Sequence, residues 1–232
     1  GMMHGFGGRW YENDTPDRFG RIDPKAGSGK ILFDSPENVA ATTMLRDLSK
    51  QWNGASLNAQ EFENVEAFKN GISHQQVMWS GLMFLQNPKE NPKFYNQLVS
   101  RDFPIGGKNT DTAKTGMKGG FGLAIPKASK NVDAIFDFAK FVTSKENAQT
   151  FIEGGGQPSN ATLLNEWGKQ PQYQVFTSIA KGIDHGHHLA QFAEGPEFFQ
   201  IITQHIGDVV TGKAEPEQAC AGMKSDVETL FK

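Results

Sequence analysis

A glycine-rich turn that leads into a short apolar run and then a helix is the feature that most constrains the fold. The sequence GGFGLAIPKASKN occupies residues 119–131. Its apolar part, Phe121–Ile125, ends at Pro126, which cannot continue the hydrogen bonding of a strand. Ser129 can then cap a helix. Apolar residues recur after it at helical spacing, at Val132, Ile135, Phe136, Ala139 and Val142. The sequence therefore predicts a strand followed by an amphipathic helix.

Capping residues and helical periodicity predict most of the remaining elements. Ser35 and Pro36 are typical of the N-cap and first position of a helix. The apolar stripe of that helix comprises Ala41, Leu45, Leu48 and Trp52. Further helices are predicted over 58–70, from Ser144, around 173–179, over 196–212 and over 216–230. Residues 75–79 predict a short buried strand, and 86–118 a loop with room for one edge strand. Strands interspersed with longer helices indicate an α/β fold.

Composition excludes several classes of partner. The chain has 23 basic and 26 acidic residues, a net charge of −3, so no broad field favours nucleic acid or an acidic membrane. The single cysteine, Cys220, excludes an intrachain disulfide and a cysteine-rich metal site. No apolar run approaches the ~20 residues that span a bilayer. The first residues, GMMHGFGG, lack the basic and apolar regions of a signal peptide, so we expect none within the chain.

Motifs that could carry chemistry each have a simpler interpretation. DHGHH at 184–188 offers four metal ligands, but neighbouring loop side chains rarely converge on one ion, so we expect a solvated loop. AGSGKI departs from a phosphate loop at Pro24 and Ile31, and GGFG departs from a dinucleotide fingerprint at Ile125. Cys220 lies on an apolar helical stripe, which indicates a buried thiol. We therefore expect no catalytic residue, no metal and no cofactor, and a protein that is not an enzyme.

Six segments, in this order along the chain, resemble the type 1 extracellular solute-binding proteins of ABC transporters. They are GGRWYEND at 7–14, LFDSPENVAA at 32–41, EAFKNGISHQQVMWSG at 66–81, GGFGLAIPKASKN at 119–131, SKENAQTFIEGGGQPSN at 144–160 and GPEFFQIITQHIGDVVTGKAEPEQA at 195–219. Together they cover most of the chain, and the nearest likeness is to sugar and polyol binders. The resemblance implies a periplasmic-binding-protein-like (type II) α/β fold, rich in helices with short strands.

In that family the crossover segment lies well past the middle of the chain, whereas here it lies at the centre. The resemblance therefore implies an incomplete, truncated form. Residues 1–118 and 189–232 would form the second lobe, and 119–188 a returning part of the first lobe, whose N-terminal core is absent. Exposed apolar surface of such a form could be covered in a homodimer.

The function implied by the resemblance is capture of a sugar or polyol between two lobes, followed by delivery to an ABC permease in the membrane. The family works in the periplasm or outside the cell. A sugar has apolar faces and a rim of hydroxyls, so a binder needs flat aromatic surfaces and short polar groups. The aromatic candidates are Trp10, Trp79 and Phe121, and the others are Arg9, Gly120, Gln157, Asn160 and Glu194.

Two departures and two alternatives accompany this hypothesis. Asn160 and the run LAQFAEG stand where many relatives have an arginine beside a proline, so the identity of the ligand does not carry over. Aromatic residues at strand ends also fit an ordinary core. The chain could instead be a fragment that binds no sugar and self-associates. A hydrolase would require convergent carboxylates or a pair of histidines in one pocket.

Overall fold

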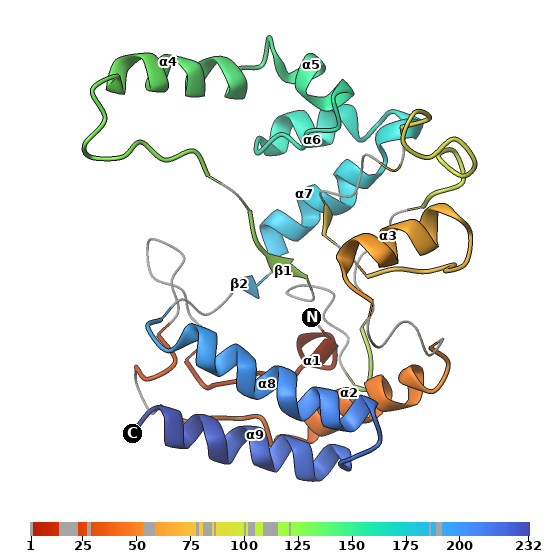
Figure 1. Cartoon of the computed structure of the whole chain (residues 1–232), viewed down its shortest axis with the longest axis vertical. Coiled ribbons are helices and arrows are strands. Elements are labelled where there is room, and N and C mark those ends of the chain that lie inside the picture. The colour runs from red at the N-terminus through yellow and green to blue at the C-terminus, as the bar shows by residue number, and fades with distance from the viewer. Residues whose placement is uncertain are drawn as a thin grey trace. The chain divides into compact units, whose positions relative to one another are not determined.

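The computed structural model describes residues 2–13, 23–26, 29–52, 59–77, 79–80, 85, 87–99, 101, 105–108, 116–120, 122–185, 187–188 and 192–232. Helices dominate these residues (Figure 1). The elements are α1 (Met2–Gly5), α2 (Pro36–Ser49), α3 (Glu61–Lys69), β1 (Met117–Lys118), α4 (Val132–Thr143), α5 (Ala148–Glu153), α6 (Ala161–Trp167), a 3-10 turn (Pro171–Tyr173), α7 (Val175–His185), β2 (His187–His188), α8 (Gly195–Val210) and α9 (Pro216–Leu230).

The chain divides into two compact units, each assembled from separate segments. Unit 1 comprises 1–57, 102–119 and 185–232, and unit 2 comprises 58–101 and 120–184. The division predicted from the sequence places 58–101 with the N-terminal segment, whereas in the structure these residues group with 120–184. The assignment of the units to particular lobes stays a prediction.

Unit 1 is a layer of helices around an aromatic core. α8 and α9 run antiparallel, α2 packs against both, and α1 packs against α2 (Figure 1). The turn between α8 and α9 needs a left-handed residue, which Gly212 provides with φ of +74°. The buried side chains of the core are Met3, Tyr11, Ile31, Phe33, Ala41, Phe198, Cys220, Met223 and Val227.

Helix α2 begins as predicted, but it buries a different face. Ser35 is the N-cap, and its Oγ accepts a hydrogen bond from the Asn38 backbone N–H at 3.3 Å. The buried residues are Asn38, Ala41 and Thr42, while Leu48 and Trp52 are exposed. Asn38 turns inward because its side-chain amide donates to the carbonyl oxygens of Arg9 and Leu32. The predicted stripe over Ala41, Leu45, Leu48 and Trp52 is therefore wrong in part.

Regular strand structure is short in the described residues. β1 and β2 pair in parallel, with Met117 opposite His187 and Lys118 opposite His188. The strands predicted at 75–79 and 121–125 are wrong where the structure describes them, because 75–77, 79 and 122–125 have no strand conformation. Met78 and Phe121 lie outside the described residues. A strand forms only against a neighbouring strand, and the described part of unit 2 contains none.

Unit 2 has its own core, formed where α5, α6 and α7 meet. Its buried residues are Ile152, Leu164, Phe176, Ile179 and Ala180. The ring of Tyr173 stacks on that of Phe176 at the edge of this core, with centroids 5.7 Å apart. Helix α4 precedes this cluster, and its N-cap is Asn131 rather than the predicted Ser129. None of the residues of α4 is buried.

Candidate functional site

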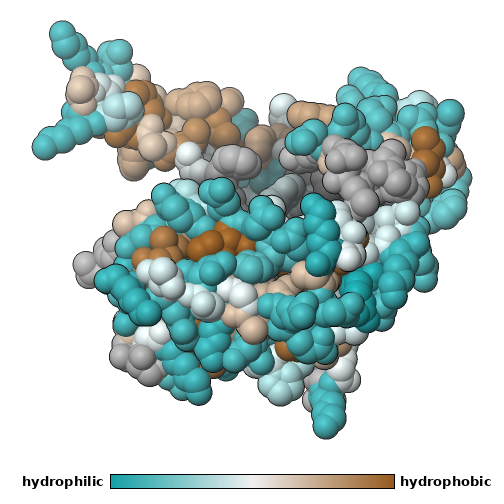
Figure 2. Space-filling view, turned by 60° about the horizontal axis from the view of Figure 1, so that its bottom comes forward, coloured by the Kyte–Doolittle hydropathy of each residue, from teal (hydrophilic) through white to brown (hydrophobic). Residues whose placement is uncertain are grey.

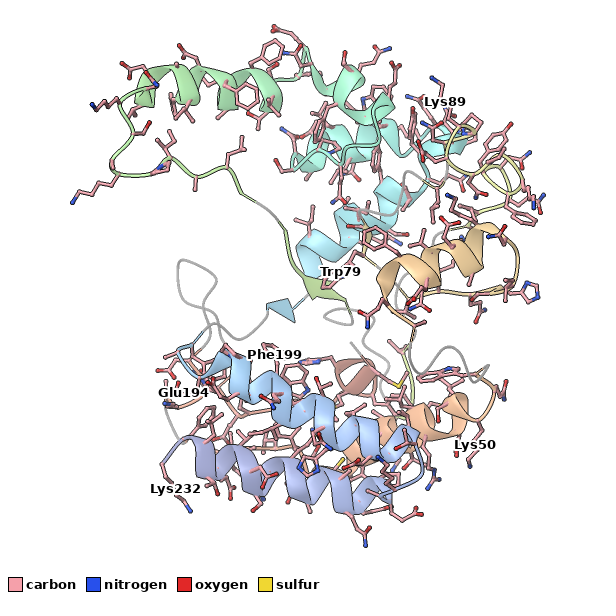
Figure 3. The ribbon with its side chains drawn as sticks, viewed as in Figure 1. Lys50, Trp79, Lys89, Glu194, Phe199 and Lys232 are labelled. Atoms are coloured by element: carbon pink, nitrogen blue, oxygen red, sulfur yellow. The ribbon has the colours of Figure 1, made fainter. Side chains whose placement is uncertain are left out.

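The predicted residues Trp79 and Gln157 both belong to unit 2, and the residue after Trp79 is hydrogen-bonded to Gln157. Trp79 is 54% exposed, and the adjacent Ser80 donates a hydrogen bond to Gln157 Oε1 at 2.7 Å. Gln157 belongs to the glycine-rich segment after α5, in which Gly155 turns the chain with φ of +87°. An exposed indole thus precedes, in the sequence, a hydroxyl that is hydrogen-bonded to a side-chain amide. Figure 3 labels Trp79 in the segment that follows α3.

The other predicted residues of unit 2 have different surroundings. Gly120 is exposed, and a Cβ atom built there would meet nothing within 4 Å, so close packing does not require its glycine. Asn160 is the N-cap of α6, where its Oδ1 accepts from the backbone N–H groups of Thr162 at 2.9 Å and Leu163 at 3.2 Å. This hydrogen bonding gives Asn160 a structural role whether or not it contacts a ligand. Phe121 lies outside the described residues.

In unit 1, Trp10 joins the aromatic core. Its ring centroid lies 6.0 Å from that of Phe33, 5.7 Å from that of Phe198 and 6.1 Å from that of Phe199. The indole Nε1 is buried and has no hydrogen-bond partner among the described residues. The neighbouring Arg9 is exposed, and its backbone carbonyl accepts from the side chain of Asn38. The packing of Trp10 agrees with the alternative considered above, an aromatic residue that fills a core.

Glu194, labelled in Figure 3, is the N-cap residue of α8. It forms an ion pair with Lys25. The hydrogen bond from Lys25 lowers the pKa of the Glu194 carboxyl, and a backbone hydrogen bond lowers it further. A carboxylate already paired with a lysine can accept from a sugar hydroxyl only through its remaining lone pairs. Arg9, Trp10 and Glu194 belong to unit 1, whereas the remaining predicted site residues fall in unit 2.

The sequence did not predict two of these contacts, the hydrogen bond between Ser80 and Gln157 and the ion pair between Lys25 and Glu194. Ser80 directly follows a candidate aromatic residue, and a hydroxyl next to an exposed indole is a local signal that could have indicated it. Lys25 precedes its partner Glu194 by 169 residues, so no spacing rule could connect them.

The described residues contain no group of three or more His, Cys, Asp or Glu side chains that could hold a metal ion. The DHGHH motif ends α7 at His185 and continues as β2 at His187–His188, and Gly186 lies outside the described residues. Of the helices in the described ranges, none has the length and apolar character needed to cross a membrane.

The fold resembles that of solved periplasmic binding proteins. Maltose-bound MalE3 of T. maritima superposes with a TM-score of 0.72 and 20% identity, covering 99% of this chain and 56% of that protein. A second solved structure is that of a protein of Synechococcus sp. MITs9220 assigned as an oligosaccharide periplasmic-binding protein. It superposes with a TM-score of 0.60 and 12% identity, and the match covers 97% of this chain and 55% of the Synechococcus protein. The chain therefore has the periplasmic-binding-protein fold class and spans about half the length of these solved structures.

Comparison of the sequence itself with known families gives a second, independent result. The profile of the bacterial extracellular solute-binding protein family matches residues 1–149, more than half of the chain. No curated protein matches the chain. Six segments carry the resemblance, and four of them, from GGRWYEND to GGFGLAIPKASKN, lie entirely within the matched region. The chain belongs to the bacterial extracellular solute-binding protein family.

Proposed function

We propose that this chain binds a sugar or oligosaccharide as the solute-binding component of an ABC import system. The observation that carries the proposal is the open indole of Trp79 beside the hydrogen-bonded pair of Ser80 and Gln157. Membership of a solute-binding family and likeness to a maltose-bound structure support it. Binding outside the cytoplasmic membrane and delivery to a membrane permease are part of the same proposal.

The chemistry of the Trp79 site suits a carbohydrate. An indole face covers the apolar C–H surface of a sugar ring, and an exposed indole is available for this contact. Ser80 donates its only hydroxyl hydrogen to Gln157 Oε1. The Ser80 oxygen can therefore accept from a sugar hydroxyl, while Gln157 Nε2 can donate to one. Unlike a single charged group, this combination recognises a neutral polyhydroxy ligand.

A titration of the full chain tests the proposal. The panel contains maltose, longer maltooligosaccharides, other disaccharides and sugar alcohols, and the readouts are tryptophan fluorescence and isothermal calorimetry. We expect saturable binding of at least one carbohydrate. Trp79→Ala should weaken that binding about tenfold or more, which corresponds to about 1.4 kcal/mol.

Trp52→Ala is the matched control, since Trp52 is 42% exposed but belongs to unit 1. It should leave the affinity unchanged. Equal loss in both variants would remove the assignment of the Trp79 site. If no carbohydrate of the panel changed the fluorescence or produced heat, the alternative of a fragment that binds no sugar and self-associates would replace the proposal. The exposed apolar surface of α4 is the observation that favours this alternative.

A further inference from the structure

Helix α3 ends at an Asn-Gly pair, Asn70 and Gly71, whose backbone is fixed by a pair of hydrogen bonds. Gly71 has φ of +71°, and its N–H donates to the Phe68 carbonyl at 3.0 Å. The N–H of Ile72 donates to the carbonyl of Ala67 at 2.9 Å. Together these bonds form a Schellman motif, a helix ending that glycine favours because it enters the left-handed region without strain.

An asparagine that precedes a glycine can lose its side-chain amide in water. The backbone nitrogen of Gly71 attacks Cγ of Asn70 and forms a bond to it. The bond from Cγ to Nδ2 then breaks, and ammonia leaves with the proton of the Gly71 nitrogen, which produces a five-membered cyclic imide. Water adds to the imide at Cγ to give aspartate, or at the backbone carbonyl carbon to give isoaspartate, and a proton returns to the nitrogen. Glycine hinders this ring closure least, since it has no side chain.

In the folded cap, the reacting atoms are held in a geometry that prevents ring closure. The ψ angle of Asn70 is 1°, so the Gly71 nitrogen eclipses the backbone nitrogen of Asn70. Ring closure requires it to eclipse Cβ of Asn70 instead, about a third of a turn away around the tetrahedral Cα. The Gly71 N–H is also engaged by Phe68, and Asn70 Nδ2 donates to the carbonyl of Glu66 at 2.8 Å. The reaction therefore requires the end of α3 to open.

The surroundings of this cap favour such opening. Asn70 is exposed, and Ile72 is 66% exposed, so water reaches the cap. Hydrophilic (teal) side chains predominate along the right edge of Figure 2, the side on which Figure 1 places α3. Phe94 packs on the cap, since a Cβ atom built at Gly71 would lie 3.0 Å from its Cζ atom. A helix end with few buried contacts opens more readily than a core.

We propose that Asn70 is a deamidation site whose reaction is controlled by the opening of the α3 end. Opening frees the Gly71 nitrogen, the imide forms, and hydrolysis leaves an acidic residue in place of Asn70. The inference rests on the hydrogen bonds of the cap and on the chemistry of the side-chain amide. It stands independently of the sugar-binding proposal.

The modified residue cannot restore the cap when the helix end closes again. An ionised carboxylate has no hydrogen to donate to the Glu66 carbonyl, and its charge lies at the negative end of the helix dipole. Isoaspartate also lengthens the main chain by one carbon atom, which disrupts the spacing of the Schellman hydrogen bonds. The segment that begins at this cap continues to Trp79 and Ser80, so the modification acts on the part of unit 2 that carries them.

The test follows deamidation of the full chain during days at mildly alkaline pH. Mass spectrometry of proteolytic peptides separates Asn70 from Asn53, whose Asn-Gly pair lies outside the described residues. The same measurement in urea gives the rate in the unfolded chain. Asn70 should react at least tenfold more slowly in the folded chain, because the end of α3 is mostly closed. The ratio of the two rates should match the protection of the Gly71 amide against hydrogen exchange, measured by NMR, since both processes remove the proton of the same N–H.

Phe94→Ala removes the ring that packs on Gly71 and should raise the rate at Asn70 several-fold in the folded chain. Tyr95→Ala is the matched control at the adjacent position, where Tyr95 is 37% exposed, and it should leave the rate unchanged. Circular dichroism shows whether each variant is folded, and the comparison of folded with unfolded wild-type chain does not depend on either. The proposal is overturned if Asn70 stays intact in the unfolded chain, or if the folded and unfolded chains deamidate there at the same rate.

Discussion

Lys25 shows how one side chain can connect distant parts of unit 1. Its ammonium group pairs with Glu194 at the start of α8 and lies 5.1 Å from the centroid of the Phe231 ring, just after α9. Exposed ion pairs contribute little to stability, because water and salt screen the charges. The Lys25 contacts therefore contribute little to the stability of unit 1, although they join three segments that are distant in the sequence.

At Cys220, burial determines reactivity. The thiol is fully buried in the core of unit 1, and its Sγ lies 3.4 Å from Thr42 Oγ1. Burial raises the pKa of the Cys220 thiol, so less of the reactive thiolate is present at pH 8. We expect an aromatic disulfide reagent to label native protein slowly and urea-unfolded protein at once, as followed by absorbance.

An exposed cysteine on the same helix calibrates that experiment. In Ser225→Cys, the new thiol should react within the mixing time while Cys220 stays unlabelled. Rapid reaction of two thiols per chain in the native variant would show that the core around Cys220 is open.

For individual site residues, the sequence predicts the type of side chain but not its contacts with residues far away in the chain. The aromatic character of Trp79 and the amide of Gln157 are visible in the sequence, but the hydrogen bond that places Ser80 against Gln157 spans 77 residues. Trp10 has the same chemistry as Trp79, yet it packs among Phe33, Phe198 and Phe199. Residue type alone cannot separate an exposed indole from a core indole, because the exposure of each depends on which distant side chains surround the ring.

Among the elements, most helices were predictable, whereas of the two strands only β1 falls where the sequence allowed an edge strand, within 86–118. A helix forms its hydrogen bonds within one segment, so Ser35 and Pro36 suffice to locate the start of α2. α9 likewise begins with Pro216 and a capping box between Glu215 and Gln218. A strand depends on a partner elsewhere in the chain, and the apolar run after Gly120 has no such partner in the described residues. The run 121–125 is apolar, as the strand prediction requires, but residues 122–125 do not form a strand.

The N-cap of α6 gives a prediction at the scale of one element. Asn160→Ala removes the acceptor for two backbone N–H groups and should destabilise unit 2 by about 1 kcal/mol. Urea unfolding followed by tryptophan fluorescence measures the change. Asn160→Asp keeps an acceptor in place and should restore most of the stability.

The control for the cap is Asn165→Ala, an exposed position inside the same helix. Alanine favours a helix interior, so this change should not lower the free energy of unfolding. A loss equal to that of Asn160→Ala would mean that the effect does not come from capping.

The whole molecule consists of two units with separate cores, and each should respond separately to core mutations. Met223→Ala should lower the stability of unit 1 by about 2–5 kcal/mol, and Leu164→Ala that of unit 2 by a similar amount. Both side chains are fully buried, one in each cluster. Scanning calorimetry should show two transitions, of which each variant shifts one.

Met44→Ala is the matched control, since Met44 is 46% exposed on α2. It should move neither transition appreciably. A single transition displaced equally by Met223→Ala and Leu164→Ala would show instead that the two units unfold as one cooperative body.

The path of the chain between the units also determines how the protein responds to backbone scission. The polypeptide passes from one unit to the other after residues 57, 101, 119 and 184. A cut at any one of these crossings leaves both fragments with residues embedded in a shared folded unit. The nicked molecule should therefore migrate as a single particle under native conditions, and its two pieces should separate only in detergent. A break in the backbone of this chain would thus leave its two folded units intact.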